Sequence, residues 1–133
     1  MRTRIKICGI TQPEHALVCA RYGADAIGLV FYAQSPRAVN VTQARAILHS
    51  LPAFVTTVGL FVNPTVSEVM SVLDEVPLDC LQFHGDEDGS FCTQFGRPYI
   101  KAIRMQTDLD LQVSLQAHPA AQSFLRFNVP FSS

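Results

Sequence analysis

Residues 54–83 read FVTTVGLFVNPTVSEVMSVLDEVPLDCLQF, and this stretch decides the fold. It opens and closes with short runs of β-branched and apolar residues, 54–62 and 78–83, which are typical of buried strands. Between them, residues 66–75 have apolar side chains at helical spacing and follow the breaker Asn63-Pro64-Thr65. A strand, a helix and a second strand in this order predict a parallel βαβ unit with a right-handed crossover.

The same alternation continues in both directions along the chain. Further strands are predicted at Arg4–Cys8, Ala26–Phe31 and Tyr99–Ile103. Further helices are predicted at Glu14–Tyr22, Thr42–Ser50, Ser90–Phe95 and Asp108–Ala117. Strand starts near 4, 26, 54, 78 and 99 repeat every 21 to 28 residues. The sequence therefore predicts an α/β fold, although this period alone does not distinguish a barrel from an open doubly wound sheet.

The first predicted helix carries entry signals. Thr11 is expected to cap it in a capping box with Glu14, and Pro13 suits its first turn. These residues predict that the helix begins between positions 11 and 14.

Composition predicts a soluble globular protein. The 133 residues are 48% hydrophobic and 16% charged. Ten basic and eleven acidic residues are scattered along the chain and give a net charge of −1. This balance argues against nucleic acid or a membrane surface as a partner. No run approaches the ~18 apolar residues that span a bilayer. The N-terminal apolar run is too short for a signal peptide, so a cytoplasmic location is expected.

The four cysteines predict neither a metal site nor a redox pair. No two of the cysteines form a C-x-x-C pair, and no histidine is suitably spaced to complete a zinc site with them; they stand at Cys8, Cys19, Cys80 and Cys92. Cys19, Cys80 and Cys92 are expected to be reduced, small buried side chains. No metal and no cofactor is predicted.

The ends of the predicted strands carry the functional information, because a parallel barrel places its chemistry at the carboxyl ends of its strands. In chain order these ends read Lys6-Ile7-Cys8-Gly9-Ile10-Thr11, Gly23-Ala24-Asp25-Ala26-Ile27-Gly28 with Phe31 and Ser35-Pro36-Arg37, Val58-Gly59-Leu60-Phe61-Val62-Asn63, Leu81-Gln82-Phe83-His84-Gly85 and Ile100-Lys101-Ala102-Ile103-Arg104. In order and spacing, over residues 4–104, the series resembles the strand motifs of the phosphoribosylanthranilate isomerase family.

The resemblance implies an incomplete (βα)8 TIM barrel with about five βα units. It also implies a phosphorylated small-molecule substrate and a reaction in tryptophan biosynthesis. That reaction is the Amadori rearrangement of phosphoribosylanthranilate to 1-(2-carboxyphenylamino)-1-deoxyribulose 5-phosphate. In the family, a general acid protonates the furanose ring oxygen, and a cysteine removes the C2 proton of the resulting Schiff base.

The resemblance places that general base at Cys8. The residue ends a strand, precedes Gly9, which lets a ligand approach the backbone, and has Lys6 two positions away on the same face. A nearby cation favours the thiolate form that a base requires.

Four further residues are predicted to bind the substrate. Arg37 suits the anthranilate carboxylate, because a guanidinium can bind a carboxylate through two parallel hydrogen bonds. His84 and Gln82 share one face at the end of a strand, and Lys6 lies on the Cys8 face. Asn63 is expected on the same rim, and Lys101 and Arg104 are candidate pocket residues. The acidic residues 86–88 are expected to be a solvated helix start.

The resemblance weakens after residue 122. A closed barrel needs about 200 residues, and the family would here show a sixth strand with an aspartate as the general acid. Aligned on Val129-Pro130, that position holds Arg126, which cannot act as a carboxylic acid does. We therefore expect a partial barrel domain at 1–122, an atypical tail at 123–133 in place of the sixth strand and the remaining barrel, and no activity of this truncated chain alone.

Two other functions stay open at this point. A catalytically inactive remnant could bind a partner, such as a complementary half-barrel, or associate with itself through its exposed sheet edges. A thiol redox protein would need a resolving cysteine near Cys8, and the sequence has none.

Overall fold

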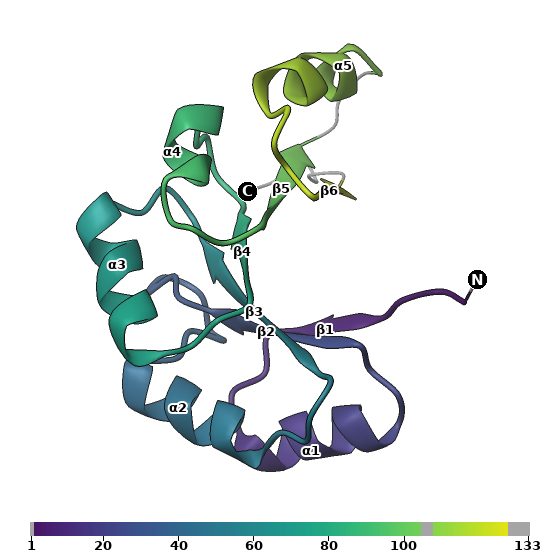
Figure 1. The fold of residues 1–133 in the computed structure, drawn as a ribbon, viewed down its shortest axis with the longest axis vertical. Coiled ribbons are helices and arrows are strands. Elements are labelled where there is room, and N and C mark those ends of the chain that lie inside the picture. The colour runs from purple at the N-terminus through teal and green to yellow at the C-terminus, as the bar shows by residue number, and fades with distance from the viewer. Residues whose placement is uncertain (1, 105–107, 128–133) are drawn as a thin grey trace.

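The computed structural model describes residues 2–104 and 108–127. In this part of the chain strands and helices alternate along the sequence, as predicted (Figure 1). The strands are β1 (Lys6–Cys8), β2 (Ala26–Val30), β3 (Thr56–Phe61), β4 (Cys80–Phe83), β5 (Tyr99–Arg104) and β6 (Ser123–Phe127). The helices are α1 (Pro13–Arg21), α2 (Val41–Ser50), α3 (Val66–Glu75), α4 (Gly89–Thr93) and α5 (Asp108–Ala117). The ranges predicted for α3 and α5 match, and the other bounds differ by at most a few residues.

Strand order distinguishes the two candidate architectures. The sheet runs β1-β2-β3-β4-β5-β6, every neighbouring pair is parallel, and no strand leaves chain order. A doubly wound sheet would reverse its order at a switch point. The helices follow one another around the sheet, with α1 and α2 at the bottom of Figure 1, α3 and α4 on the left and α5 at the top. The fold is therefore the predicted incomplete barrel.

One hydrogen bond shows that the sheet is curved. Lys6 on β1 donates from its Nζ to Oε1 of Gln82 on β4. In a flat sheet two strands three places apart would be separated by roughly 14 Å, beyond the reach of these side chains. The concave face must therefore turn β1 towards β4, as the wall of a barrel does.

Residues 123–127 correct the prediction of an atypical tail in place of the sixth strand. They form β6, which pairs with β5 from Ile100↔Ser123 to Arg104↔Phe127. The free edge of β5 offers a row of unpaired backbone groups, and a short run rich in aromatic and apolar residues satisfies them as a strand. Residues 128–133 of the predicted tail lie outside the described residues.

The start of α1 also differs from the prediction. Its N-cap is Gln12, and no side chain caps it, so the expected box of Thr11 and Glu14 is wrong. Because the helix begins at Pro13, Thr11 lies one position too early to reach the first free N–H groups. Pro13 does occupy the first turn as predicted. A complete capping box occurs instead at α2, between Asn40 and Gln43.

The core lies between the sheet and its helices. Phe83 of β4 is at its centre, with ring centroids 6.2 Å from Phe61, 5.7 Å from Phe91 and 6.1 Å from Tyr99. Aromatic contacts of this kind add to the stabilisation from burial itself. This packing holds the carboxyl ends of β3 and β4 and the start of β5 in fixed relative positions. None of the helices in residues 2–104 and 108–127 has the length and apolar character needed to cross a membrane.

Candidate active site at the carboxyl ends of the strands

The structure brings three of the predicted site residues together. Cys8 at the end of β1, Arg37 in the loop after β2 and His84 after β4 line one hollow of about 480 Å³. Val30, Tyr32 and Leu60 are among its other walls. The hollow lies at the carboxyl ends of the strands, where the predicted barrel would carry its chemistry. Three of the four residues predicted on one rim therefore share a hollow, whereas the fourth, Asn63, lines an adjoining one. Their roles in catalysis and binding stay predictions.

Two glycines make room for the Cys8 thiol and the Arg37 side chain. A Cβ at Gly28 would lie 3.0 Å from Cys8 Sγ. Gly9 has a φ of +85°, and a Cβ there would lie 2.5 Å from Cδ of Arg37. The stem of Arg37 therefore lies directly over the backbone that follows Cys8, and any larger residue at position 9 would displace it.

The loop after β2 folds back onto its own strand and so places Arg37. Val39 N–H donates to the carbonyl of Val30 over 2.9 Å, and Arg37 N–H donates to Oγ of Ser35 over 3.1 Å. The exposed guanidinium is thereby held at the mouth of the hollow, where a ligand can reach it.

Lys6 and Gln82 occupy a different position from the other predicted binding residues. They hydrogen bond to each other one side-chain layer below Cys8 and His84, and neither lines the hollow. Gln82 is only 1% exposed. Their contact with substrate stays a prediction, whereas the structure shows them bracing β1 against β4.

The four thiols differ strongly in exposure. Cys8 is exposed and Cys19 is half-buried, whereas Cys80 and Cys92 are buried, as expected for small core side chains. Burial raises the pKa of the Cys80 thiol, and it raises the pKa of Cys92 to about 12, helped by the nearby Glu87 carboxylate. A thiol with so high a pKa is almost entirely protonated at neutral pH.

We expect iodoacetamide to modify Cys8 first and Cys92 last in the native chain at pH 8. Alkylation requires an accessible sulfur in its thiolate form; Cys8 is exposed, whereas Cys92 is buried and its pKa is raised to about 12. Timed alkylation followed by peptide mass mapping gives the four rates. Faster modification of Cys80 or Cys92 than of Cys8 would contradict both the burial order and the role of Cys8 as a base.

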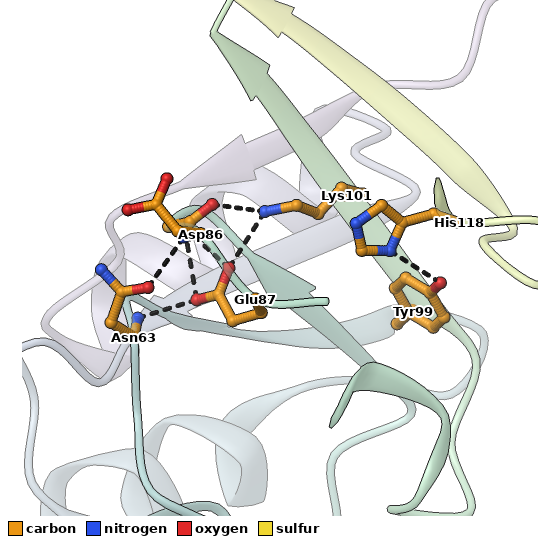
Figure 2. Close-up of polar contacts among 7 residues, drawn as sticks. Asn63, Asp86, Glu87, Tyr99, Lys101 and His118 are labelled. Atoms are coloured by element: carbon orange, nitrogen blue, oxygen red, sulfur yellow. Dashed lines mark hydrogen bonds and ion pairs between the residues drawn. The ribbon is translucent and has the colours of Figure 1, made fainter. Parts of the chain in front are cut away.

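A second hollow of about 510 Å³ adjoins the first and shares Val62 and His84 with it. Asn63, Glu87 and Lys101 lie along its wall. Lys101 and Glu87 form an ion pair at 3.0 Å, with only 7% and 3% of their side chains exposed (Figure 2).

This ion pair corrects the prediction that residues 86–88 are a solvated helix start. Asp88 does cap α4, accepting from Phe91 N–H over 2.7 Å, but Glu87 turns inward to Lys101. The sequence held a signal for it, because a lysine within the apolar run of β5 needs a counter-charge. The strand register puts Lys101 opposite Phe83, on the helix side of the sheet, rather than on the Cys8 side.

Next to this pair, Tyr99 and His118 form a buried contact. The Tyr99 hydroxyl lies 3.1 Å from Nδ1 of His118. Figure 2 shows the two side chains facing each other. Burial lowers the pKa of His118, so the ring is neutral at physiological pH. The contact joins β5 to the turn after α5, and sequence reasoning did not find it.

The remaining predicted residues are placed by the backbone alone. β6 carries Arg126 opposite Ile103, and Arg104 pairs with Phe127. The prediction that Arg104 shares a face with Ile100 and Ala102 stays a prediction. The assignment of Arg126 to the position of a general acid stays a prediction. Within the described residues no group of three or more His, Cys, Asp or Glu side chains is arranged to hold a metal ion.

Comparison with known proteins gives consistent matches. The family described as N-(5'phosphoribosyl)anthranilate (PRA) isomerase matches residues 5–126. N-(5'-phosphoribosyl)anthranilate isomerase of Neisseria meningitidis is 55% identical over 124 residues, covering 93% of this chain and 60% of the relative. This chain thus spans about 60% of the length of that relative.

Solved structures agree with these matches. The structure of phosphoribosyl anthranilate isomerase from Thermotoga maritima superposes on this chain with a TM-score of 0.90 and 34% sequence identity. The match covers 99% of this chain and 64% of the Thermotoga maritima chain. A phosphoribosyl anthranilate isomerase in complex with reduced 1-(o-carboxyphenylamino)-1-deoxyribulose 5-phosphate matches 98% of this chain and 68% of its own, with a TM-score of 0.88 and 35% identity.

Proposed function

Since this chain belongs to the N-(5'-phosphoribosyl)anthranilate isomerase family, we propose that it supplies the general base and the anthranilate-binding side of that isomerase. The observation that carries the proposal is the single hollow lined by Cys8, Arg37 and His84. A base, a cation and an imidazole facing one space suit a ligand that carries both a carboxylate and an acidic C–H bond.

Cys8 performs the proton abstraction. Once the furanose ring has opened to a protonated Schiff base, the Cys8 thiolate takes the proton from C2. The C2–H electron pair forms the C1=C2 double bond, the C=N π electrons move to the nitrogen, and a neutral enolamine forms. The enolamine then becomes the ketose. The exposure of Cys8 and the space left by Gly28 support this role, because the sulfur must approach the substrate carbon.

Arg37 and His84 hold the substrate for this step. The guanidinium binds the anthranilate carboxylate through two parallel hydrogen bonds, and His84 lines the same hollow. Holding the ring at two points keeps the sugar carbon within reach of Cys8. The reduced product analogue bound by a relative has the carboxyphenyl group that this arrangement would bind.

The general acid and the phosphate site are proposed to come from outside the described residues. Among those residues, the ones that line the Cys8 hollow include no carboxylate. Protonation of the ring oxygen needs such an acid, so we propose that residues 1–133 alone are inactive.

A partner-binding half-barrel is the second candidate function. Within the described residues β1 and β6 each pair on one side only, and Ile5 and Ile7 at the β1 edge are 48% and 37% exposed. Open edges of this kind pair with a further strand when one is offered.

A growth assay tests the proposed function. We expect residues 1–133 alone not to restore growth to a tryptophan auxotroph that lacks this isomerase. Co-expression with the part of the Neisseria meningitidis relative beyond its match to this chain should restore growth, because the two parts together supply base, acid and phosphate site. We call this pair the assembled enzyme.

Two controls complete the assay. The full-length relative must restore growth, and Cys8→Ala must abolish the growth given by the assembled enzyme. Growth with residues 1–133 alone, lost on Cys8→Ala, would show that no outside acid is needed. Failure of a soluble assembled enzyme to restore growth would contradict the proposed function.

A further inference from the structure

We propose that Glu87 and Lys101 are positioning residues that hold His84 at the wall of the Cys8 hollow. Neither residue lines that hollow. The sequence analysis took Lys101 as a candidate pocket residue and Glu87 as a solvated side chain, and it gave neither a positioning role. The inference rests on the proposed function for the identity of the ligand, whereas its geometric content stands on the structure alone.

Glu87 joins the ends of β3 and β4 to the middle of β5 through one carboxylate. Its Oε2 accepts from Asn63 N–H after β3 over 2.7 Å, and its Oε1 accepts from Gly85 N–H after β4 over 2.9 Å. The same Oε1 lies 3.0 Å from Nζ of Lys101 on β5. Figure 2 shows these contacts of Glu87. Because only 3% of its side chain is exposed, the charge-assisted hydrogen bonds are screened little by solvent.

Lys101 holds the same loop from the other side. Its ammonium donates to the carbonyl of Gly85 as well as to Glu87. Gly85 is therefore bound through both its N–H and its carbonyl, by two side chains that are bound to each other. Gly85 directly follows His84, so this pair of contacts fixes the backbone that carries the imidazole.

Asn63 completes the connection between the two loops. It has a φ of 46°, and its Oδ1 accepts from Asp86 N–H over 2.7 Å. A Cβ at Gly85 would lie 2.5 Å from that same oxygen, so the loops after β3 and β4 are in direct contact. With Glu87 binding both loops, they should move as one body, and His84 lines the two hollows that meet there.

Hydrogen exchange on the 133-residue chain tests the geometric part. The informative variant is the double change Glu87→Gln with Lys101→Met, which leaves no unpaired buried charge and so favours folding. We expect the amides of Asn63 and Gly85 to exchange about tenfold faster or more, because each loses a carboxylate acceptor. The Leu81 amide, which donates to Pro98 O within the sheet, should keep its rate. Asp86→Asn, which changes an exposed carboxylate one residue away, should leave all three unchanged.

Ligand binding tests whether the pair acts through His84. The probe is reduced 1-(o-carboxyphenylamino)-1-deoxyribulose 5-phosphate, titrated calorimetrically into the assembled enzyme. We expect the double variant to bind it about tenfold more weakly. In a His84→Ala background the same double change should have little further effect, since the residue being positioned is gone.

The outcomes separate the two proposals. Equal acceleration of the Leu81, Asn63 and Gly85 amides would mean that the pair only stabilises the fold, and the positioning role would be overturned. Unchanged exchange at Asn63 and Gly85 would overturn it as well. Equal weakening of binding with and without His84 would remove His84 as the residue through which the pair acts. If the unmodified assembled enzyme fails to bind the probe, the proposed function fails, and hydrogen exchange still decides the geometric inference.

Discussion

Cys8→Ala is expected to lower the turnover of the assembled enzyme by about 10²- to 10⁴-fold, the usual contribution of a general base. The thiol is exposed and lines the hollow, and Gly28 beside it lacks a Cβ that would lie 3.0 Å from the sulfur. Alanine removes the proton acceptor but leaves Arg37 and His84 in place. KM should therefore change far less than kcat. Steady-state kinetics with enzymatically generated phosphoribosylanthranilate give both constants.

Cys19→Ala is the matched control for this prediction. Cys19 lies half-buried on α1, packs against the core and takes no part in the hollow. Its replacement should leave turnover nearly unchanged. A Cys8→Ala enzyme with more than a tenth of the original turnover would exclude Cys8 as the base and move that role to another residue.

Lys101→Met is expected to destabilise the 133-residue chain by about 3–5 kcal/mol, measured as the free energy of unfolding in urea. The change leaves the Glu87 carboxylate, which is 3% exposed in its side chain, without its counter-charge in the interior. Burial of an unpaired charge is among the most costly single changes that a fold can suffer. Adding Glu87→Gln to Lys101→Met should recover much of the loss, because the double variant has no buried charge.

The control for stability is Asp86→Asn. Asp86 is exposed, so its replacement should alter the free energy of unfolding by less than about 0.5 kcal/mol. A similarly small effect of Lys101→Met would show that the ion pair is accessible to water in solution, contrary to its burial in the structure.

Local sequence signals were sufficient for β1 to β5, for the helices and for much of the site. The apolar runs and their spacing predicted β1 to β5 and the five helices, because side-chain periodicity reflects which face of an element is buried. Cys8, Arg37 and His84 were identified from the residues at strand ends, and parallel strands bring those ends to one rim. β6 was missed because residues 123–127 do not match the family motif of the sixth strand, and they were therefore assigned to a tail despite their strand-like composition.

By itself the sequence determined the βαβ repeat, the family resemblance and the three residues that line the Cys8 hollow. Only the tertiary structure decided the strand order, the curvature that joins Lys6 to Gln82, and the inward turn of Glu87 to Lys101. The physical reason is that periodicity reports burial within one element, whereas a contact between residues 14 or 76 positions apart depends on how separate strands are brought together. From the sequence alone, an acidic loop residue such as Glu87 is expected to be solvated. Only the tertiary structure shows that the buried Lys101 of another strand lies beside it.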